Sequence, residues 1–409
     1  MPIPSPRTIL HVSTRLILGG SQENTVLSCE GQSRLGHELH LAYGPIYGPE
    51  GSLLDRARSF RTDDGRSIGC HEIPDMVRQI SPLRDRRCLS QLGRLIDEIE
   101  PDVVHTHSSK AGVLGRAAAW RHAKRRKCAV VHTIHGPPFH PLLPAHKNTI
   151  YAAAERLAAK RCHLIVSVAD AMTESFLARG IGAPGQYVTV RSGMETETFL
   201  NPAPGEDRAA ARAELGLSED DFVIGTVARL AEHKGHDDLL DALGDELKRR
   251  PKWKLLWVGD GWWRDRLLGR VAEMGLADRV ITTGLVPQHR VPAMLRTMDV
   301  LAHPSYREGL PRTVPQALLC GVLPVAHDVD GTREICREME TGRLIAPGDT
   351  AGLRGAIVWA AEHPDERRRM VDRGRDEVAR EFTAERMVER LEEVYDRALE
   401  LAEHTPTRR

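Results

Sequence analysis

Short apolar runs recur along this chain, and most of them are followed by a segment long enough to form a helix. Such runs, without strict alternation of polar residues, are typical of parallel strands that are buried on both faces. Their alternation with helical segments predicts a doubly wound α/β architecture. The predicted strands span residues 8–13, 38–43, 102–107, 128–134, 164–168 and 187–190 in the first half, and 222–227, 254–258, 279–283, 300–303 and 322–326 in the second.

The chain has 409 residues, which exceeds what one hydrophobic core usually serves. The two series of strands are separated by the Pro- and Gly-containing segment Asn201–Ala210, which is interpreted as a linker. We therefore expect Rossmann-like domains at residues 1–198 and 199–382, and a C-terminal helix within 383–409. The apolar stripe of that helix is predicted to consist of Met387, Leu391, Val394, Ala398 and Leu401.

Composition excludes several classes of protein. Lysine and arginine total 57, as do aspartate and glutamate, so no global charge indicates a nucleic-acid partner. The seven cysteines are scattered without a CxxC motif, which is typical of reduced thiols in a cytoplasmic protein. No run of eighteen apolar residues predicts a spanning helix, and the N-terminus lacks the regions of a signal peptide.

Two features of the first half fall at predicted strand ends, where open α/β sheets bind ligands. Gly19-Gly20 follows the first strand and would let the backbone approach a ligand, although a tight turn explains the pair equally well. His135 follows the run at 128–134. His105, His107 and His132 alternate along strands, and because a zinc site needs three or four converging ligands, we expect core histidines and no metal.

In the second half, two loops carry charged residues. Arg229 and Lys234 lie between the run at 222–227 and the next helix, and two cations beside a helix N-terminus predict a diphosphate site. After the run at 300–303, Glu308 precedes another helix. A carboxylate there would repel a phosphate, so it is better suited to accept hydrogen bonds from sugar hydroxyls.

The segment PSYREGLP, with Glu308 as its acid, resembles the C-terminal signature of retaining GT-B glycosyltransferases of family four, the glycogen-synthase-like group 1 proteins. The segments HSSKAGVLGRAA and SGMETETF are similar to the N-terminal half of that family. The resemblance implies two Rossmann-like domains that face a cleft. Residues 1–198 would then bind the acceptor, 199–382 would bind a nucleotide-sugar donor, and the helix in 383–409 would return to the N-terminal domain.

The resemblance also implies roles for individual residues. His135 would lie near the reacting sugar, Arg229 and Lys234 would hold the donor diphosphate, and Glu308 would face the transferred sugar. These four form the predicted catalytic set. The remaining predicted donor-binding residues are Gly20, Gly259, Asp260, Val286, Gly309, Leu310, Arg312, Thr313 and Gln316.

Gln316 departs from the family signature, which has a second acid eight positions after the first. Hydrogen bonds to charged groups contribute about 1.5–3 kcal/mol and neutral ones about 0.5–1.5 kcal/mol. The glutamine is therefore expected to weaken donor binding by about 1 kcal/mol without abolishing the chemistry. Alternatively, Thr313 and Gln316 form a capping box, with Pro315 in the first helical turn.

Two further motifs have competing interpretations. Asp328-Val329-Asp330 matches the metal-binding motif of the other glycosyltransferase fold, but we interpret Asp328–Gly331 as a turn and expect no metal or other cofactor. The basic run Arg121–Lys127 is interpreted as a solvated helix end. The alternative is a patch that contacts the anionic inner surface of a membrane.

The resemblance thus implies a metal-independent, retaining hexosyltransferase. It would move a sugar from a nucleoside diphosphate to a glycan, lipid or small-molecule acceptor. We expect it to act in the cytoplasm or at the cytoplasmic membrane face, in cell-envelope or polysaccharide biosynthesis. The alternatives are a nucleotide-sugar epimerase on the same fold and a non-catalytic relative that only binds the nucleotide sugar.

Overall fold

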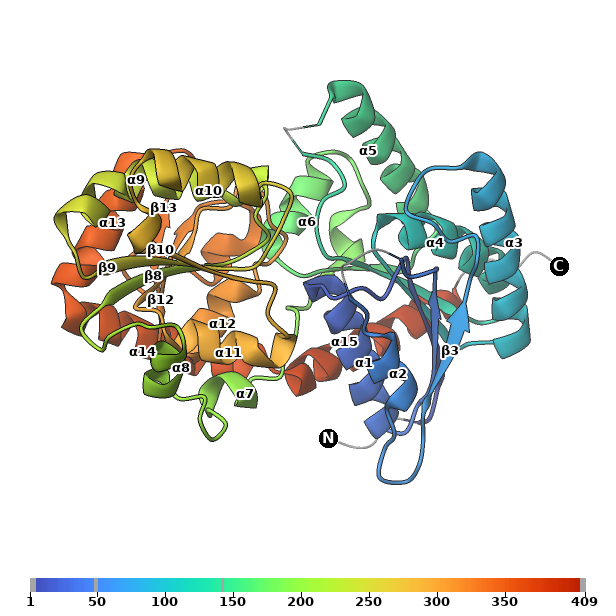
Figure 1. Ribbon diagram of the computed structural model, residues 1–409. Helices are drawn as coiled ribbons and strands as arrows, with labels where there is room; N and C mark the ends of the chain where they lie inside the picture. Colours follow the sequence, from blue (N-terminus) through green and yellow to red (C-terminus); the bar gives the residue numbers. More distant parts are fainter. Residues whose placement is uncertain (1–4, 48–50, 141–142, 405–409) are drawn as a thin grey trace. The chain divides into compact units, whose positions relative to one another are not determined.

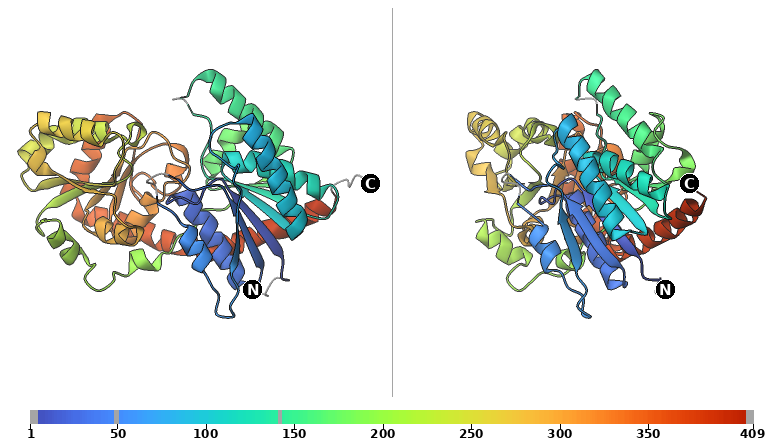
Figure 2. Two further views of the ribbon diagram at one scale, coloured as in Figure 1. Left: turned by 45° about the vertical axis from the view of Figure 1, so that its right-hand side comes forward. Right: turned by 90° about the vertical axis from the view of Figure 1, so that its right-hand side faces the viewer.

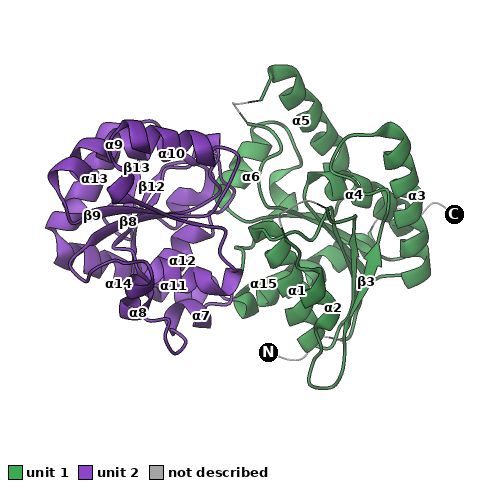
Figure 3. Ribbon diagram, in the orientation of Figure 1, with its two compact units in different colours: residues 1–194, 384–409 green, residues 195–383 purple. Residues whose placement is uncertain are grey.

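The computed structural model, shown in Figure 1 and from two further sides in Figure 2, describes residues 5–47, 51–140 and 143–404. The chain divides into two compact units, which Figure 3 distinguishes by colour. Unit 1 contains Met1–Met194 and Ala384–Arg409, and unit 2 contains Glu195–Thr383. The segment Asn201–Ala210 therefore lies within unit 2. At the boundary, the Ala384 N–H donates a hydrogen bond to the Met194 carbonyl oxygen at 3.1 Å.

Unit 1 is built on a seven-stranded sheet in which every neighbouring pair is parallel. The strand order is β3-β2-β1-β4-β5-β6-β7. The strands are β1 (Thr8–Ser13), β2 (Glu38–Tyr43), β3 (Ile68–Glu72), β4 (Val103–His107), β5 (Ala129–Ile134), β6 (Leu164–Ser167) and β7 (Tyr187–Thr189). The helices are α1 (Gly20–Arg34), α2 (Leu54–Ser59), α3 (Pro82–Ile99), α4 (Ser109–Ala123), α5 (Ala145–Ala159), α6 (Asp170–Leu177) and α15 (Ala384–Glu403).

Helices cover both faces of this sheet (Figure 2). Along β1, Ile9 packs into the cluster that contains α1 and α15, whereas Leu10 and Val12 pack into the cluster that contains α3 and α4. The fit of α15 is close, because a Cβ at Gly31 of α1 would lie 2.5 Å from the Val388 side chain. The predicted stripe of α15 is buried except for Leu401, which is 41% exposed.

Unit 2 repeats the plan with six parallel strands in the order β10-β9-β8-β11-β12-β13. The strands are β8 (Phe222–Val227), β9 (Trp253–Val258), β10 (Val280–Gly284), β11 (Val300–His303), β12 (Leu323–His327) and β13 (Arg343–Ile345). The helices are α7 (Glu197–Leu200), α8 (Arg208–Glu214), α9 (His236–Arg249), α10 (Arg264–Glu273), α11 (Val291–Arg296), α12 (Thr313–Leu319), α13 (Thr350–Glu362) and α14 (Pro364–Glu381). The prediction of two doubly wound parallel sheets is confirmed.

In each unit the strand order reverses direction once, between β1 and β4 and between β8 and β11. In unit 1, β2 and β3 extend the sheet on one side of β1, and β4 to β7 extend it on the other side. In unit 2, β9 and β10 lie on one side of β8, and β11 to β13 lie on the other. At such a reversal, the loops at the carboxyl ends of the two central strands run in opposite directions. Open α/β sheets bind their ligands in the crevice between these loops. We therefore expect the functional site in the loops that follow β1, β4, β8 and β11.

Candidate functional site

The charged pair predicted in the second half meets at the strand reversal of unit 2. Lys234 ends the short 3₁₀ segment Glu232–Lys234 after β8, and Glu308 lies in the loop after β11. The Lys234 Nζ donates a hydrogen bond to the Glu308 Oε1 at 2.6 Å. Their side chains are only 18% and 14% exposed. The structure thus places a cation and a carboxylate, from separate loops, at the point where a ligand is expected.

Backbone contacts hold these two loops together. The Tyr306 N–H and the Ser305 hydroxyl both donate to the His233 carbonyl oxygen, at 2.9 and 3.2 Å. Gly235 adopts a left-handed φ of 68°, and a Cβ there would lie 2.0 Å from the Pro304 carbonyl oxygen. Because only glycine fits this position, the approach of the two loops depends on the sequence Lys-Gly.

The carboxylate of Glu308 is fixed on several sides. His303, the last residue of β11, has its Nε2 3.1 Å from the Glu308 Oε1. Burial would raise the pKa of the Glu308 carboxyl, but the charge of Lys234 and the contact with His303 hold this pKa well below its ordinary value. The carboxylate therefore stays ionised at neutral pH and acts only as a hydrogen-bond acceptor. This is the chemistry that sugar hydroxyls require.

The backbone around Glu308 is held by the segment after β12. The Glu308 N–H donates to the Asp330 Oδ2 at 2.8 Å, and the Gly331 N–H donates to the Gly309 carbonyl oxygen at 3.0 Å. Asp328 instead accepts two hydrogen bonds from the Arg333 guanidinium, at 2.8 and 2.7 Å. Both carboxylates of the Asp-x-Asp motif therefore have structural partners, and Asp330 begins the 3₁₀ turn Asp330–Glu334.

Arg229 occupies the other end of the loop after β8. Its guanidinium lies 5.5 Å from the centre of the Trp262 ring, which is 67% exposed. The loop after β9 packs closely here, since the Leu230 N–H donates to the Asp260 carbonyl oxygen at 3.0 Å and a Cβ at Gly261 would lie 2.3 Å from the Leu230 carbonyl oxygen.

The loop after β10 contacts the loop after β9. The Gly259 N–H donates to the Gly284 carbonyl oxygen at 3.0 Å, and Val286 follows two residues later. Gly259 also needs a left-handed φ of 135°, and a Cβ there would lie 2.1 Å from the Ala228 carbonyl oxygen. The predicted donor-binding residues Gly259, Asp260 and Val286 thus lie on loops that are hydrogen-bonded to the Arg229 loop or to one another.

The loop from Gly309 to Arg312 leads from Glu308 into α12, whose first residue is Thr313. Leu310 is buried, and the hydroxyl of Thr313 lies 3.3 Å from the His303 Nδ1. The capping-box interpretation of Gln316 is wrong, because Arg312 is the N-cap and no side chain caps this helix. Gln316 is half-buried in the first turn of α12, and its N–H donates to the Arg312 carbonyl oxygen at 3.3 Å.

The two remaining predicted site residues belong to unit 1. Gly20 begins α1 directly after the loop that follows β1. His135 follows β5, and its Nε2 lies 3.1 Å from the Nδ1 of His107. His132 lies deeper in β5, buried, with its Nδ1 2.9 Å from the Thr106 hydroxyl.

Three residues of the unit 2 site were not predicted from the sequence. His303 could have been found by the reasoning applied to His135, because each histidine lies at the carboxyl end of a strand. Trp262 had a weaker signal, a large aromatic directly after a Gly-Asp-Gly turn. Asp330 was interpreted only as part of a turn, and no local pattern indicated its bond to the Glu308 backbone, which joins residues 22 positions apart.

The basic run Arg121–Lys127 spans the end of α4 and the turn after it. Arg125 pairs with Asp97 at 3.3 Å, Arg126 pairs with Glu100, and Lys127 pairs with Glu403 of α15. These exposed pairs partly neutralise the run and agree with a solvated helix end. Among the described residues, no helix is both long enough and apolar enough to cross a bilayer.

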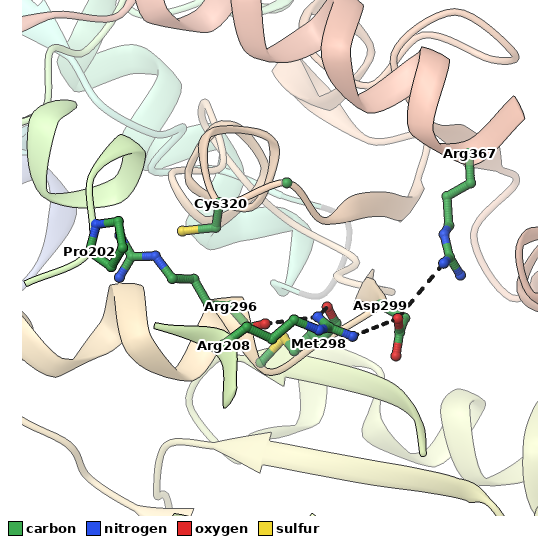
Figure 4. Close-up of a pocket in the computed structure, with 8 residues that line it drawn as sticks. Pro202, Arg208, Arg296, Met298, Asp299, Cys320 and Arg367 are labelled. Atoms are coloured by element: carbon green, nitrogen blue, oxygen red, sulfur yellow. Dashed lines mark hydrogen bonds and ion pairs between the residues drawn. The ribbon is translucent and has the colours of Figure 1, made fainter. Parts of the chain in front are cut away.

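A cavity of about 470 Å³ lies elsewhere in unit 2, at the amino end of β11 (Figure 4). It is lined by Pro202, Arg208, Arg296, Met298, Asp299, Cys320, Gly321 and Arg367. Its guanidinium groups hold the chain together: Arg296 donates to the Thr198 and Phe199 carbonyl oxygens, and Arg208 donates to the Met298 carbonyl oxygen. Since the cavity opens at the opposite edge of the sheet from Lys234 and Glu308, it is separate from the candidate site.

Comparison with known families decides the identity of the chain. Residues 207–377 match the family model for glycosyl transferases group 1, and residues 18–198 match that for Glycosyltransferase Family 4. The chain belongs to glycosyltransferase family four. It is therefore a transferase enzyme. The two matches cover both units, so the resemblance carried by the PSYREGLP segment is confirmed.

Curated relatives of this family-four enzyme extend over most of its length. EpsD of Bacillus subtilis strain 168, which is named as a glycosyltransferase, is 28% identical over 76% of this chain and 80% of its own. The UDP-Gal:α-D-GlcNAc-diphosphoundecaprenol α-1,3-galactosyltransferase of Escherichia coli is 26% identical over 95% of this chain and 96% of its own.

Solved structures confirm the fold of the enzyme. Alr3699/HepE of Anabaena, crystallised with UDP-glucose, superposes with a TM-score of 0.78 at 20% identity, over 95% of this chain and 99% of that chain. Sucrose-phosphate synthase of Thermosynechococcus elongatus gives a TM-score of 0.79 at 20% identity, over 95% and 98%. The family-four enzyme therefore has the GT-B fold that the sequence predicted.

Proposed function

We propose that this glycosyltransferase moves a hexose from a nucleoside diphosphate to an acceptor hydroxyl, with the donor bound at the strand reversal of unit 2. The observation that carries the proposal is the 2.6 Å contact between Lys234 and Glu308. It combines a cation suited to a phosphate with an ionised acceptor suited to a hexose hydroxyl. A nucleotide sugar offers both groups within a few ångströms of each other.

In this mechanism Lys234 and Arg229 bind the donor diphosphate. Breaking the bond between the sugar and the phosphate leaves negative charge on the leaving group. Fixed cations stabilise that charge more strongly in the transition state than in the ground state. Donor binding would also give Lys234 a second anionic partner, while Glu308 accepts hydrogen bonds from the sugar hydroxyls.

We further propose retention of the anomeric configuration. The bond from the anomeric carbon to the β-phosphate oxygen breaks, the acceptor oxygen bonds to the same face of that carbon, and the acceptor proton passes to the leaving phosphate. The products are a glycoside and a nucleoside diphosphate. Glu308 does not act as a nucleophile in this scheme, because Lys234, His303 and the Asp330-bound backbone already hold it in place.

The relatives favour a uridine donor and a lipid-linked or glycan acceptor. The E. coli relative is named for transfer from UDP-galactose to a diphosphoundecaprenol-linked sugar, and HepE was crystallised with UDP-glucose. On this basis we propose a role in cell-envelope or polysaccharide biosynthesis, at the cytoplasmic side of the membrane. A peripheral contact through Arg121–Lys127 would be supported by sedimentation with anionic vesicles and contradicted by equal binding to neutral ones.

Incubation with labelled UDP- and GDP-hexoses and a panel of acceptor lipids and glycans tests the proposal. Free nucleoside diphosphate together with a glycosylated acceptor supports transfer. An altered sugar that is still attached to the nucleotide would instead identify an epimerase, for which the Gln316 departure leaves room. Binding without any conversion would identify a non-catalytic relative.

A further inference from the structure

Three histidines form a continuous row across the sheet of unit 1. His11 lies on β1, His107 on β4, and His135 directly after β5. The Nε2 of His135 is 3.1 Å from the Nδ1 of His107, and the Nε2 of His107 is 2.9 Å from the Nδ1 of His11. His11 and His107 are 0% and 1% exposed. The hydrogen-bonded row therefore runs from the partly exposed His135 into the interior.

The inner end of the row reaches a carboxylate. The Nε2 of His11 is 2.9 Å from the Gln32 Oε1 in α1, and the Gln32 Nε2 donates to the Glu392 Oε1 in α15 at 3.0 Å. The other Glu392 oxygen pairs with Arg7 at 3.3 Å and with His37 at 3.0 Å. A carboxylate in such an ion pair only accepts hydrogen bonds. The Gln32 amide must therefore turn its NH₂ toward Glu392 and its oxygen toward His11.

This orientation determines the proton positions in turn. Burial lowers the pKa of His11 to about 4 and lowers that of His107 well below its ordinary value, so both rings are neutral near pH 7 and each has one N–H. His11 must donate from Nε2 to Gln32, which leaves its Nδ1 as an acceptor. His107 then donates from Nε2 to His11, and its own Nδ1 accepts from the Nε2–H of His135.

We propose that Glu392, acting through Gln32, His11 and His107, fixes His135 in the tautomer that is protonated on Nε2. In its neutral form His135 then has no proton on Nδ1, so this nitrogen can accept a hydrogen bond from a hydroxyl but cannot donate one. These four are positioning residues. The last step, presentation to a sugar hydroxyl, rests on the proposed function, whereas the tautomer does not.

A metal ion is the competing explanation for this cluster, because His11, His105 and His107 offer ring nitrogens within 4.8 Å of one another. All six ring nitrogens of these residues, however, already have partners in the protein. Those of His105 lie 2.6 Å from the Tyr395 hydroxyl and 2.6 Å from the Thr133 hydroxyl. An ion would have to break several of these hydrogen bonds, including the one between His11 and His107, so the structure favours the hydrogen-bonded row.

Nitrogen-15 NMR of the full chain with labelled histidine tests the proposal without any substrate. Protonated and bare ring nitrogens have well-separated shifts, and His11, His107 and His135 are assigned by single substitution to glutamine. We expect the Nε2–H tautomer at all three. In Glu392→Gln the Arg7 and His37 donors hold the oxygen of the new amide, because His37 accepts from the Arg7 N–H at its Nδ1 and therefore donates from Nε2. The NH₂ of the new amide then faces Gln32 and reverses the Gln32 amide, so signals of the Nδ1–H tautomer should appear at His135. Gln32→Leu, which removes the acceptor for His11, is the second variant if the first does not fold.

Thr133→Val is the matched control, because it removes a buried histidine hydrogen bond from the same cluster without touching the row. It should leave the His135 tautomer unchanged. Because the reversed orientation is favoured in Glu392→Gln, at most about half of the molecules keep the competent tautomer, and kcat/KM for transfer should fall at least about two-fold. An Nδ1–H tautomer at His135 in the wild type, an unchanged tautomer in both variants, or one equivalent of bound zinc by elemental analysis would overturn the proposal. Loss of transferase activity alone, with the tautomers as expected, would count only against the proposed function.

Discussion

Replacement of Lys234 by methionine tests the central contact of the site. The variant keeps most of the side-chain volume but removes the charge that faces the proposed diphosphate. Loss of one donor to developing negative charge typically costs about 2.7–4 kcal/mol of barrier. We therefore expect kcat to fall by about 10²–10³-fold, measured as nucleoside diphosphate release in the presence of acceptor.

The same substitution should destabilise unit 2. Breaking a buried ion pair costs about 3–5 kcal/mol, but these side chains retain some exposure and His303 stays 3.1 Å from Glu308, so we expect about 2–3 kcal/mol. For a unit of this size, that corresponds to a decrease in Tm of roughly 4–12 °C. Lys252→Met is the matched control, because its Nζ also lies 2.6 Å from a carboxylate, that of Asp220, but both side chains are more than 60% exposed. Its stability should change by no more than about 0.5 kcal/mol, and its activity should not change.

The pH dependence of this stability difference has a defined sign. The pKa of Glu308 is lowered in the folded state, so the stabilisation is fully present above the ordinary glutamate pKa of about 4.3 and is lost as the pH falls through the lowered value. The Tm gap between the wild type and Lys234→Met should therefore narrow from pH 6 to pH 3. A kcat within three-fold of the wild type, a similar loss in Lys252→Met, or a Tm gap that widens on acidification would refute the reasoning.

Five further substitutions have defined outcomes. Gln316→Glu should tighten donor binding about five-fold by calorimetry, whereas a large loss of turnover would show that Gln316 has another role. Gly235→Ala should lower the free energy of unfolding by more than about 1 kcal/mol in thermal unfolding, because Gly235 has a positive φ and a Cβ there would meet a carbonyl oxygen. Gly269→Ala is the control: a Cβ at this helical position would have no heavy atom within 4 Å, so the variant should gain about 0.5–1 kcal/mol. Asp330→Asn retains an acceptor for the Glu308 N–H and should keep most of its activity. Asp330→Ala removes this acceptor and should lose about ten-fold in kcat. Equal loss in both variants would contradict the role of Asp330 in positioning Glu308.

The fold could be predicted from the sequence where strands are apolar along their length. The bounds of β1, β2 and β8 agree with the predicted runs, because each strand lies inside its sheet and is buried over most of its length. β3 and β13 were missed because each lies at a sheet edge, where no other described strand pairs with its outer side and polar residues such as His71 and Arg343 are tolerated.

The site could be predicted only in part, for a different reason. Arg229, Lys234 and Glu308 follow strands and belong to recognisable local patterns. The bonds that fix them join distant residues, such as Asp330 to Glu308, and no local pattern reports such pairs. The histidine row is the extreme case, because His11, His107 and His135 become neighbours only through the order of the strands.

The division of unit 1 into two stretches of chain has a consequence for synthesis. Residues 1–194 leave the ribosome without α15, yet Ile9 of β1 packs in the same core as Leu391 and Val394 of that helix. All of unit 2 must be translated before this apolar surface is covered, which takes roughly 10–40 s at typical elongation rates. During that interval the nascent N-terminal segment is expected to be a client for chaperones. A fragment ending before Ala384 should therefore aggregate, although it retains every strand of the first sheet.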